Sequence, residues 1–319
     1  MSIIIRGGRF LYRKLGWAEK LPEHQGETLK EDEGNALIKS LILADDPVCI
    51  TRLGASETFC LKNYLDLQES ATYSELQKVL FAWRGRQPSW SKPATVTITN
   101  NAGVFPGSPE SLSEFSRIFL DYLTSADMLC RWDVFAEAYF HQKYCPQAKL
   151  SHPEAYEPYY HQKPWSGALK GKKVLVIHPY KESILSQYQK RELLFDDEDI
   201  LPAFDLKVVK AVQSIAGSKT PYKSWVEALR SMEDEIRNTD FEVAIIGAGA
   251  YGLPLAAFVK RLGKKAIHIG GATQILFGIK GKRWDDMPRI NRFYNEHWVR
   301  PLDSEKPQGF KAVESGAYW

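Results

Sequence analysis

The chain has 319 residues, which is long enough for one or two domains with a large buried core. Hydrophobic residues make up 44% and charged residues 25%, ordinary values for a globular protein that exclude a largely disordered chain. The 42 basic and 39 acidic side chains leave a net charge of +3, which argues against a surface that grips nucleic acid throughout. We therefore expect a folded protein with no nucleic-acid partner.

Cysteine spacing and charge distribution bear on the cellular compartment in which the protein is expected. No pair of the four cysteines has the spacing of a metal or redox site, so they are predicted to be buried thiols in a reducing compartment. The longest uncharged stretch, Val243–Val259, contains three glycines and a proline and is typical of a strand, turn and helix rather than a membrane span. The basic residues near the start allow at most peripheral contact with an anionic membrane: Arg6, Arg9, Arg13 and Lys14. The sequence thus predicts a cytoplasmic protein, with a peripheral position at the inner face of the membrane as a further option.

The first half of the chain alternates short strands with helices. Residues 1–45 have mixed charge and no clean period, and we expect a helical lead-in there. The β-branched run Val48–Thr51 predicts a strand, and the alternation of Thr95–Thr99 predicts another. Residues 152–165 are rich in Pro, Tyr and His and are expected to link two halves. The other expected elements are helices from the turn after Arg52 to about Leu67, over Tyr73–Trp83 and over Pro109–Leu123, and a strand near Met128.

From Lys172 onward, unbroken apolar strands alternate regularly with helices. This pattern is typical of a parallel sheet covered on both faces, so the predicted fold class is Rossmann-like α/β. The expected domain covers residues 46–285, with two halves, 46–151 and 166–285, and a tail over 286–319. The expected strands are Lys173–His178, Phe204–Val209, Phe241–Ile246 and Lys265–Ile269, and the expected helices are Ser183–Leu194, Tyr222–Arg237 and Leu253–Leu262.

The glycine-rich segment Gly247-Ala-Gly-Ala-Tyr-Gly252 lies between an expected strand and an expected helix. In that context, glycines permit a tight turn and let the backbone approach a phosphate group near the helix N-terminus. The sequence therefore predicts that Gly247, Gly249 and Gly252 bind a nucleotide phosphate. Close packing of the helix against the strand is the alternative explanation for the same small residues.

The charges after this turn argue against NAD. A dinucleotide site needs an acidic residue after the next strand to hold a ribose hydroxyl. No acidic residue lies between Tyr251 and Trp284, whereas Lys280, Lys282 and Arg283 lie close together in that interval. We therefore expect an anionic nucleotide near Lys282 and Arg283, and no NAD.

A second motif, Arg52-Leu-Gly-Ala-Ser-Glu57, follows the strand at Val48. Its arginine, glycine and glutamate fall at the carboxyl edge of a parallel sheet, where open α/β sheets bind ligands. The alternative is local: Ser56 caps the helix, and Glu57 stabilises its positive end. The residues alone leave these two interpretations open.

Polar residues at two other strand ends are further candidates. His178 could act as a base or as a hydrogen-bond donor to a phosphate group. Ser183 and Arg191 follow it at helical spacing. A hydrogen-bonded structural histidine is the alternative. Asn100 and Asn101 form a polar loop after the expected strand at Thr95, and are candidates for substrate binding or for a simple turn.

Together these motifs resemble the bacterial glycosyltransferases of the GT-D fold, a family first catalogued as a domain of unknown function in polysaccharide gene clusters. Arg52-Leu-Gly-Ala-Ser-Glu57 resembles the family's Arg-x-Gly-Asp-Gly-Glu signature, and residues 246–270 are similar to its closing strand, glycine turn, helix and strand. The resemblance implies nucleotide-binding roles for Gly54, His268 and Gly270. Ala55 replaces the family aspartate, so Glu57 is the one carboxylate left in the motif, and a role for Mg²⁺ or Mn²⁺ stays open.

The resemblance implies a transferase that moves a sugar from a nucleotide-sugar donor to a polysaccharide or lipid-linked acceptor during cell-surface polysaccharide synthesis. In such a site, Glu57 would be the acceptor base or a metal ligand, with Arg52 and His178 as the other catalytic candidates. Two alternatives remain from the residues. One is a dinucleotide-dependent oxidoreductase, and the other is a non-catalytic nucleotide- or sugar-binding partner of an assembly complex, in which Ala55 marks lost catalysis.

Overall fold

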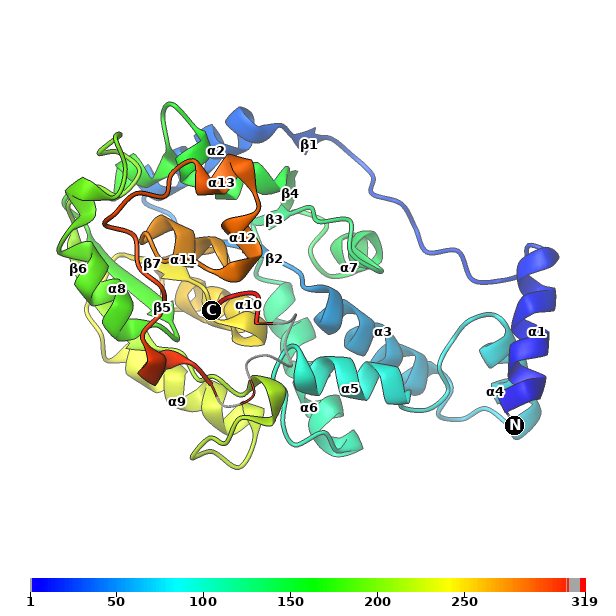
Figure 1. Cartoon of the computed structure of the whole chain (residues 1–319). Helices are drawn as coiled ribbons and strands as arrows, with labels where there is room; N and C mark the ends of the chain where they lie inside the picture. The colour runs from blue at the N-terminus through cyan, green and yellow to red at the C-terminus, as the bar shows by residue number, and fades with distance from the viewer. Residues whose placement is uncertain (1, 308, 310–315) are drawn as a thin grey trace.

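The computed structural model of this chain describes residues 2–307, 309 and 316–319. Its centre is one sheet of eight strands in the order β1-β4-β3-β2-β8-β7-β5-β6, and every neighbouring pair is parallel (Figure 1). The predicted Rossmann-like class is therefore confirmed. The strands are β1 Thr28–Leu29, β2 Val48–Arg52, β3 Met128–Cys130, β4 Lys149–Ser151, β5 Lys173–His178, β6 Asp205–Lys210, β7 Val243–Ile246 and β8 Lys265–His268.

Helices cover both faces of the sheet, because every central strand is apolar on both sides. Along β5, Leu175 and Ile177 enter the first hydrophobic core, and Val174 and Val176 enter the second. Helices α3, α5, α6, α7, α9 and α10 line the first core, and α2, α8, α11, α12 and α13 line the second. The α-helices are α1 Ser2–Lys14, α2 Glu31–Leu43, α3 Ala55–Glu69, α4 Glu75–Trp83, α5 Lys92–Asn100, α6 Pro109–Leu123, α7 Glu137–Tyr144, α8 Lys181–Tyr188, α9 Trp225–Arg237, α10 Gly252–Arg261, α11 Ala272–Leu276, α12 Lys282–Asp285 and α13 Pro288–Asn291. The 3₁₀ turns are η1 Pro153–Tyr156, η2 Pro158–Tyr160, η3 Trp165–Leu169, η4 Arg191–Leu193, η5 Ile215–Gly217, η6 Gly249–Tyr251 and η7 Asp303–Glu305.

The two halves expected from the sequence supply adjacent strands to this sheet: residues 46–151 supply β2, β3 and β4, with β1 added from the lead-in, and residues 166–285 supply β5, β6, β7 and β8. They meet where β2 pairs with β8, with Val48 opposite Lys265. The connecting residues 152–165 are packed rather than extended: Tyr156, Tyr159 and Trp165 are buried in the second core. The sheet is therefore continuous across the junction between the halves.

The strand predicted over Thr95–Thr99 is wrong, because these residues lie within helix α5. The Ser91 side chain accepts a hydrogen bond from the Ala94 backbone N–H, and Pro93 occupies the first turn, as in many helix starts. Ala94 and Ile98, four residues apart, are the buried pair. Burial at helical spacing therefore outweighs the local β-branched alternation.

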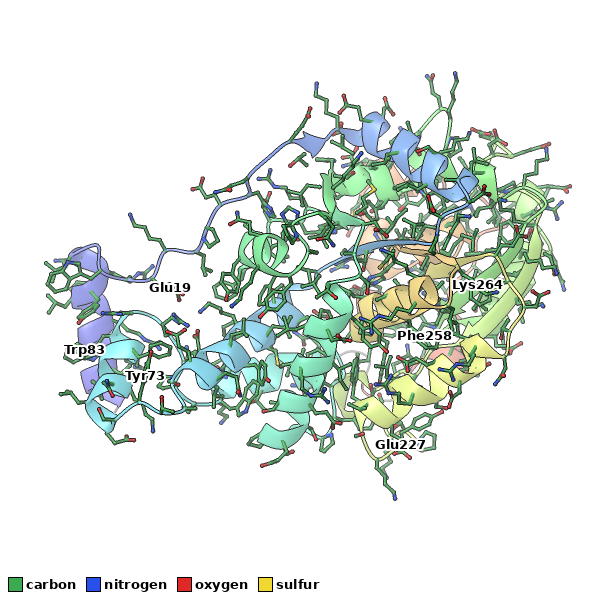
Figure 2. The ribbon with its side chains drawn as sticks, turned by 180° about the vertical axis from the view of Figure 1, so that it is seen from behind. Glu19, Tyr73, Trp83, Glu227, Phe258 and Lys264 are labelled. Carbon is green, nitrogen blue, oxygen red and sulfur yellow. The ribbon has the colours of Figure 1, made fainter. Side chains whose placement is uncertain are left out.

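The N-terminal part of the chain contains more structure than the sequence predicted. The lead-in forms α1 and α2 but also strand β1, which pairs with β4 at the edge of the sheet. Helix α1 lies against α4, and both stand at the end of the molecule away from β6 (Figure 1). In Figure 2, the labelled Trp83 and Tyr73 mark this end, with Lys264 on the far side. No helix among the described residues has the length and apolar character needed to cross a membrane.

Candidate functional site

A cavity of about 330 Å³ lies at the carboxyl edge of the sheet. The turns after β2, β5, β7 and β8 form its walls, as expected for ligand sites in open parallel sheets. It brings together ten of the residues predicted from the sequence: Arg52, Gly54, Glu57, Asn101, His178, Gly247, Gly249, His268, Gly270 and Arg283.

Five predicted site residues do not line this cavity: Asn100, Ser183, Arg191, Gly252 and Lys282. The buried hydroxyl of Ser183 donates a hydrogen bond to Glu305, which also accepts the backbone N–H groups at the start of α8. The Arg191 guanidinium pairs with the neighbouring Glu192. Helical spacing behind His178 therefore led away from the cavity, since Ser183 is held by Glu305 in the C-terminal part of the chain and Arg191 lies beyond the end of α8, in η4.

Arg52 leaves the end of β2 and is half-buried in the cavity wall. Its guanidinium stacks on the Trp132 ring at 4.6 Å. Within the described part of the chain, Arg52 forms no hydrogen bond and no ion pair. Its N–H donors therefore remain available to a ligand, and a guanidinium fork is well suited to a phosphate or carboxylate.

Glu57 lies in the first turn of α3, and its carboxylate folds back over the backbone of Gly54. A Cβ at position 54 would lie 2.1 Å from Oε2 of Glu57, so this arrangement requires the glycine. Burial raises the pKa of Glu57, although the Glu57 backbone N–H and the nearby Arg52 oppose that shift. A carboxylate with a raised pKa is better suited to accept a proton near neutral pH.

The three glycines of the turn after β7 have different physical roles. A Cβ at Gly247 would lie 2.6 Å from the His178 ring, and one at Gly252 would lie 2.1 Å from Nε2 of His268. These two glycines are required by the close packing of histidine rings, which supports the packing explanation for them. Gly249 has a φ of +54° with open space around its Cβ position, so its backbone faces the cavity freely.

His178 and His268 line the cavity as neutral rings. Burial lowers the pKa of each to about 3, and Arg52 also lowers that of His268. Nδ1 of His178 accepts the Tyr180 backbone N–H at 3.1 Å, so the ring proton is on Nε2. His178 is therefore suited to donate a hydrogen bond to an anion and not to act as a base. Nδ1 of His268 lies 3.1 Å from the Thr51 hydroxyl, which fixes the orientation of that ring.

Sequence reasoning missed Trp132, whose ring stacks on Arg52 at the cavity wall. The loop that carries it is held by Glu137, whose carboxylate accepts the backbone N–H groups of Trp132 and Asp133. A signal was available, because Trp132 follows the expected strand near Met128 and must emerge at the same edge of a parallel sheet. Tyr318 and Trp319 also line the cavity, and no local pattern predicts their position.

The cavity offers a poor donor set for a divalent metal. Glu57 is the one carboxylate among the described residues that line it, whereas Mg²⁺ and Mn²⁺ favour several oxygen ligands. The clusters of three possible ligands within the described ranges lie elsewhere: His24, Asp133 and Glu137, and Glu31, His152 and Glu154. The residues that line the cavity therefore do not fit a divalent metal.

The fold and the cavity define an α/β protein with a cavity at the carboxyl edge of a parallel sheet. A solved structure described as the highly conserved domain of unknown function 1792, with a distinct glycosyltransferase fold, is similar to this chain. The similarity covers 88% of this chain and 92% of that one, with a TM-score of 0.44 and 11% sequence identity. No protein-family model and no curated protein matches the sequence.

Proposed function

We propose that this protein is a glycosyltransferase that moves a sugar from a nucleoside-diphosphate sugar to a hydroxyl group of a polysaccharide or lipid-linked acceptor. The observation that carries the proposal is that Arg52 and Glu57 both line one wall of the cavity. Arg52 is a half-buried cation without a hydrogen bond or ion pair in the described chain, and Glu57 is a carboxylate whose pKa burial raises. The Arg52 guanidinium can stabilise an anionic leaving group, and the Glu57 carboxylate can accept a proton.

The donor diphosphate would bind to Arg52, to the open backbone at Gly249 and to the Nε2–H of His178, with Arg283 at the exposed rim. The neutral histidine contributes a hydrogen bond, and the arginines contribute charge. These donors are fixed by the fold before the ligand arrives, which is how an enzyme stabilises charge as it develops.

In the transfer step, the acceptor oxygen forms a bond to the anomeric carbon, and the bond from that carbon to the diphosphate oxygen breaks. The bonding electrons go to the diphosphate, whose added negative charge Arg52 stabilises. The proton of the acceptor hydroxyl goes to Glu57. Because the pKa of Glu57 is raised, its conjugate acid forms more readily than that of an exposed glutamate.

Calorimetric titration tests the ligand class. We expect UDP, GDP, ADP or CDP to bind more tightly than NAD, because Arg52 faces the site and residues 252–283 supply no carboxylate for a second ribose. Tighter binding of NAD would overturn the proposal. The same protein is then incubated with the sugar form of the nucleotide that binds, and released nucleoside diphosphate is measured. Nucleotide binding without any release would favour the non-catalytic partner instead.

A further inference from the structure

Helix α1 is held against α4 in one fixed orientation. Gly8 is buried against Trp83, and a Cβ at position 8 would lie 2.2 Å from that ring. Nε of Arg9 donates a hydrogen bond to the Ala82 carbonyl oxygen at 2.8 Å, and the Tyr12 ring packs edge-on against Trp83. The face of α1 that carries these three residues is therefore covered, and the remaining faces point away from α4.

The uncovered part of α1 and the residues that follow it are unusually apolar. Phe10 is 63% exposed and Trp17 60% exposed, and Leu11 and Leu15 are also exposed. Twelve large hydrophobic side chains are exposed in the described part of the chain, and four of them lie within residues 10–17. Such clustering marks a contact surface rather than the scattered exposure of ordinary surfaces.

The same surface carries uncompensated positive charge. Arg6, Arg13 and Lys14 are exposed, and the sequence has no acidic residue between positions 2 and 18. Arg6 and Arg13 form no ion pair with any described residue, and the Lys14 ammonium lies over the Phe10 ring at 4.9 Å. The uncovered side of α1 thus combines cations with Phe10 and Leu11, and Leu15 and Trp17 follow directly after the helix ends. A helix with mixed cations and apolar side chains is typical of a membrane interface.

We propose that the outer surface of α1 and residues 15–17 docks this protein on an anionic phospholipid membrane. Charge complementarity favours an anionic membrane over a second copy of the chain as the partner of this surface. A second copy of the chain in a two-fold contact would place the same cations against each other, which opposes association. The apolar side chains would enter the acyl boundary while Arg6, Arg13 and Lys14 remain at the level of the phosphates. The inference does not depend on the proposed transferase activity, although docking would bring the cavity to lipid-linked acceptors.

Co-sedimentation with vesicles tests the proposal, using phosphatidylcholine with and without phosphatidylglycerol. We expect wild-type protein to bind the anionic vesicles and to lose binding at high salt. Phe10→Ser combined with Leu15→Ser should reduce the partition coefficient by about tenfold or more, since two apolar side chains no longer leave water. Arg13→Gln combined with Lys14→Gln should reduce it by about fivefold for each cation, and only on anionic vesicles.

The matched control combines Leu193→Ser with Leu302→Ser, which removes two similarly exposed leucines from the C-terminal half. Control binding should equal that of the wild type, and unchanged melting curves should show that every variant is folded. Absence of wild-type binding to anionic vesicles, or equal loss in the control, would overturn the proposal. A wild-type dimer in size-exclusion chromatography that the α1 variants convert to monomers would assign this surface to a second copy instead. Calorimetric nucleotide binding, measured in parallel, reports on the cavity separately.

Discussion

Two glycine-bearing turns meet at the carboxyl edge of this sheet, and they use glycine for different reasons. In the turn after β2, Gly54 makes room for the Glu57 carboxylate. In the turn after β7, Gly247 and Gly252 make room for the rings of His178 and His268. The first turn thus places a titratable group against the cavity, and two of the three glycines in the second make close packing possible.

The two turns therefore have different roles in the cavity wall: one holds the residues proposed to act in the reaction, and the other supports the packing around them. The turn after β2 joins Arg52, the last residue of the strand, to the start of α3, which carries Glu57; the proposed transfer depends on these two charged residues. The turn after β7 supplies backbone at Gly249 and supports two neutral histidines. Substitutions in the first turn should therefore change turnover and binding, whereas those at the packed glycines should change stability.

The largest expected effect is on turnover. Glu57→Gln should lower the rate of sugar transfer by roughly a hundredfold or more, the usual scale for a general base. Steady-state release of nucleoside diphosphate measures this. Stability should change little, because a charge at a helix N-terminus contributes only about 0.3–1 kcal/mol. Burial raises the pKa of Glu57, so ionising it opposes folding as pH rises, and the neutral glutamine removes that cost.

The pH profile provides a control for this variant. In the wild type, kcat/KM should increase with pH through the raised pKa of Glu57, and Glu57→Gln should lack that inflection. Normal turnover in the variant, or loss of folding, would return Glu57 to the structural role of stabilising the start of α3.

Loss of Arg52 should weaken donor binding. Arg52→Ala should reduce nucleoside-diphosphate affinity by about 10- to 100-fold, as expected for a charged hydrogen-bonding group lost from a binding site. Its guanidinium stacks on Trp132 and forms no hydrogen bond or ion pair with a described residue, so the loss in stability should be about 0.5–1 kcal/mol. Calorimetry and thermal unfolding measure both quantities. Arg191→Ala is the matched control, since Arg191 lies outside the cavity lining; equal weakening by both variants would argue against a phosphate at Arg52.

The packed glycines should respond through stability. Gly252→Ala should lower the free energy of unfolding by about 1–3 kcal/mol, because its Cβ would overlap the buried His268 ring. Gly7→Ala, in an open position of α1, should be neutral or stabilising by up to about 1 kcal/mol. Urea unfolding of both variants measures the difference. If the two are equally stable, the close contact with His268 does not explain this glycine.

The smallest expected effect concerns metal. Because Glu57 is the one carboxylate among the described residues that line the cavity, EDTA should weaken nucleotide binding by less than about tenfold. Ala55→Asp should make binding more dependent on Mn²⁺. Nucleotide titrations of both proteins with EDTA and with Mn²⁺ measure this. Complete loss of wild-type binding in EDTA would require carboxylates from outside this motif, with Asp285 and Asp286 as the first candidates.

Local sequence was sufficient wherever one period or one turn decides the structure. The apolar runs of β5, β7 and β8 predicted parallel strands, because strands buried on both faces need apolar residues at every position. The sequence also predicted the positions of the strand-to-helix turns at Gly54 and Gly247, because each turn follows a predicted strand. Parallel strands place all their carboxyl ends at one edge, so residues far apart in sequence meet there.

The tertiary structure decided what local patterns left open. Thr95–Thr99 alternates like a strand, but burial of Ala94 and Ile98 makes it part of a helix. Nor does the glycine pattern specify that His178 and His268 fill the space beside Gly247 and Gly252.

The remaining parts of the cavity come from segments distant in the chain. Trp132 stacks on Arg52, and Tyr318 and Trp319 close around the same space. Sequence by itself determined the parallel sheet and the edge at which its turns meet, because unbroken apolar runs are a local property. Only the tertiary structure decided which side chains fill the cavity and which protonation states burial imposes on them, because both depend on neighbours that no local pattern specifies.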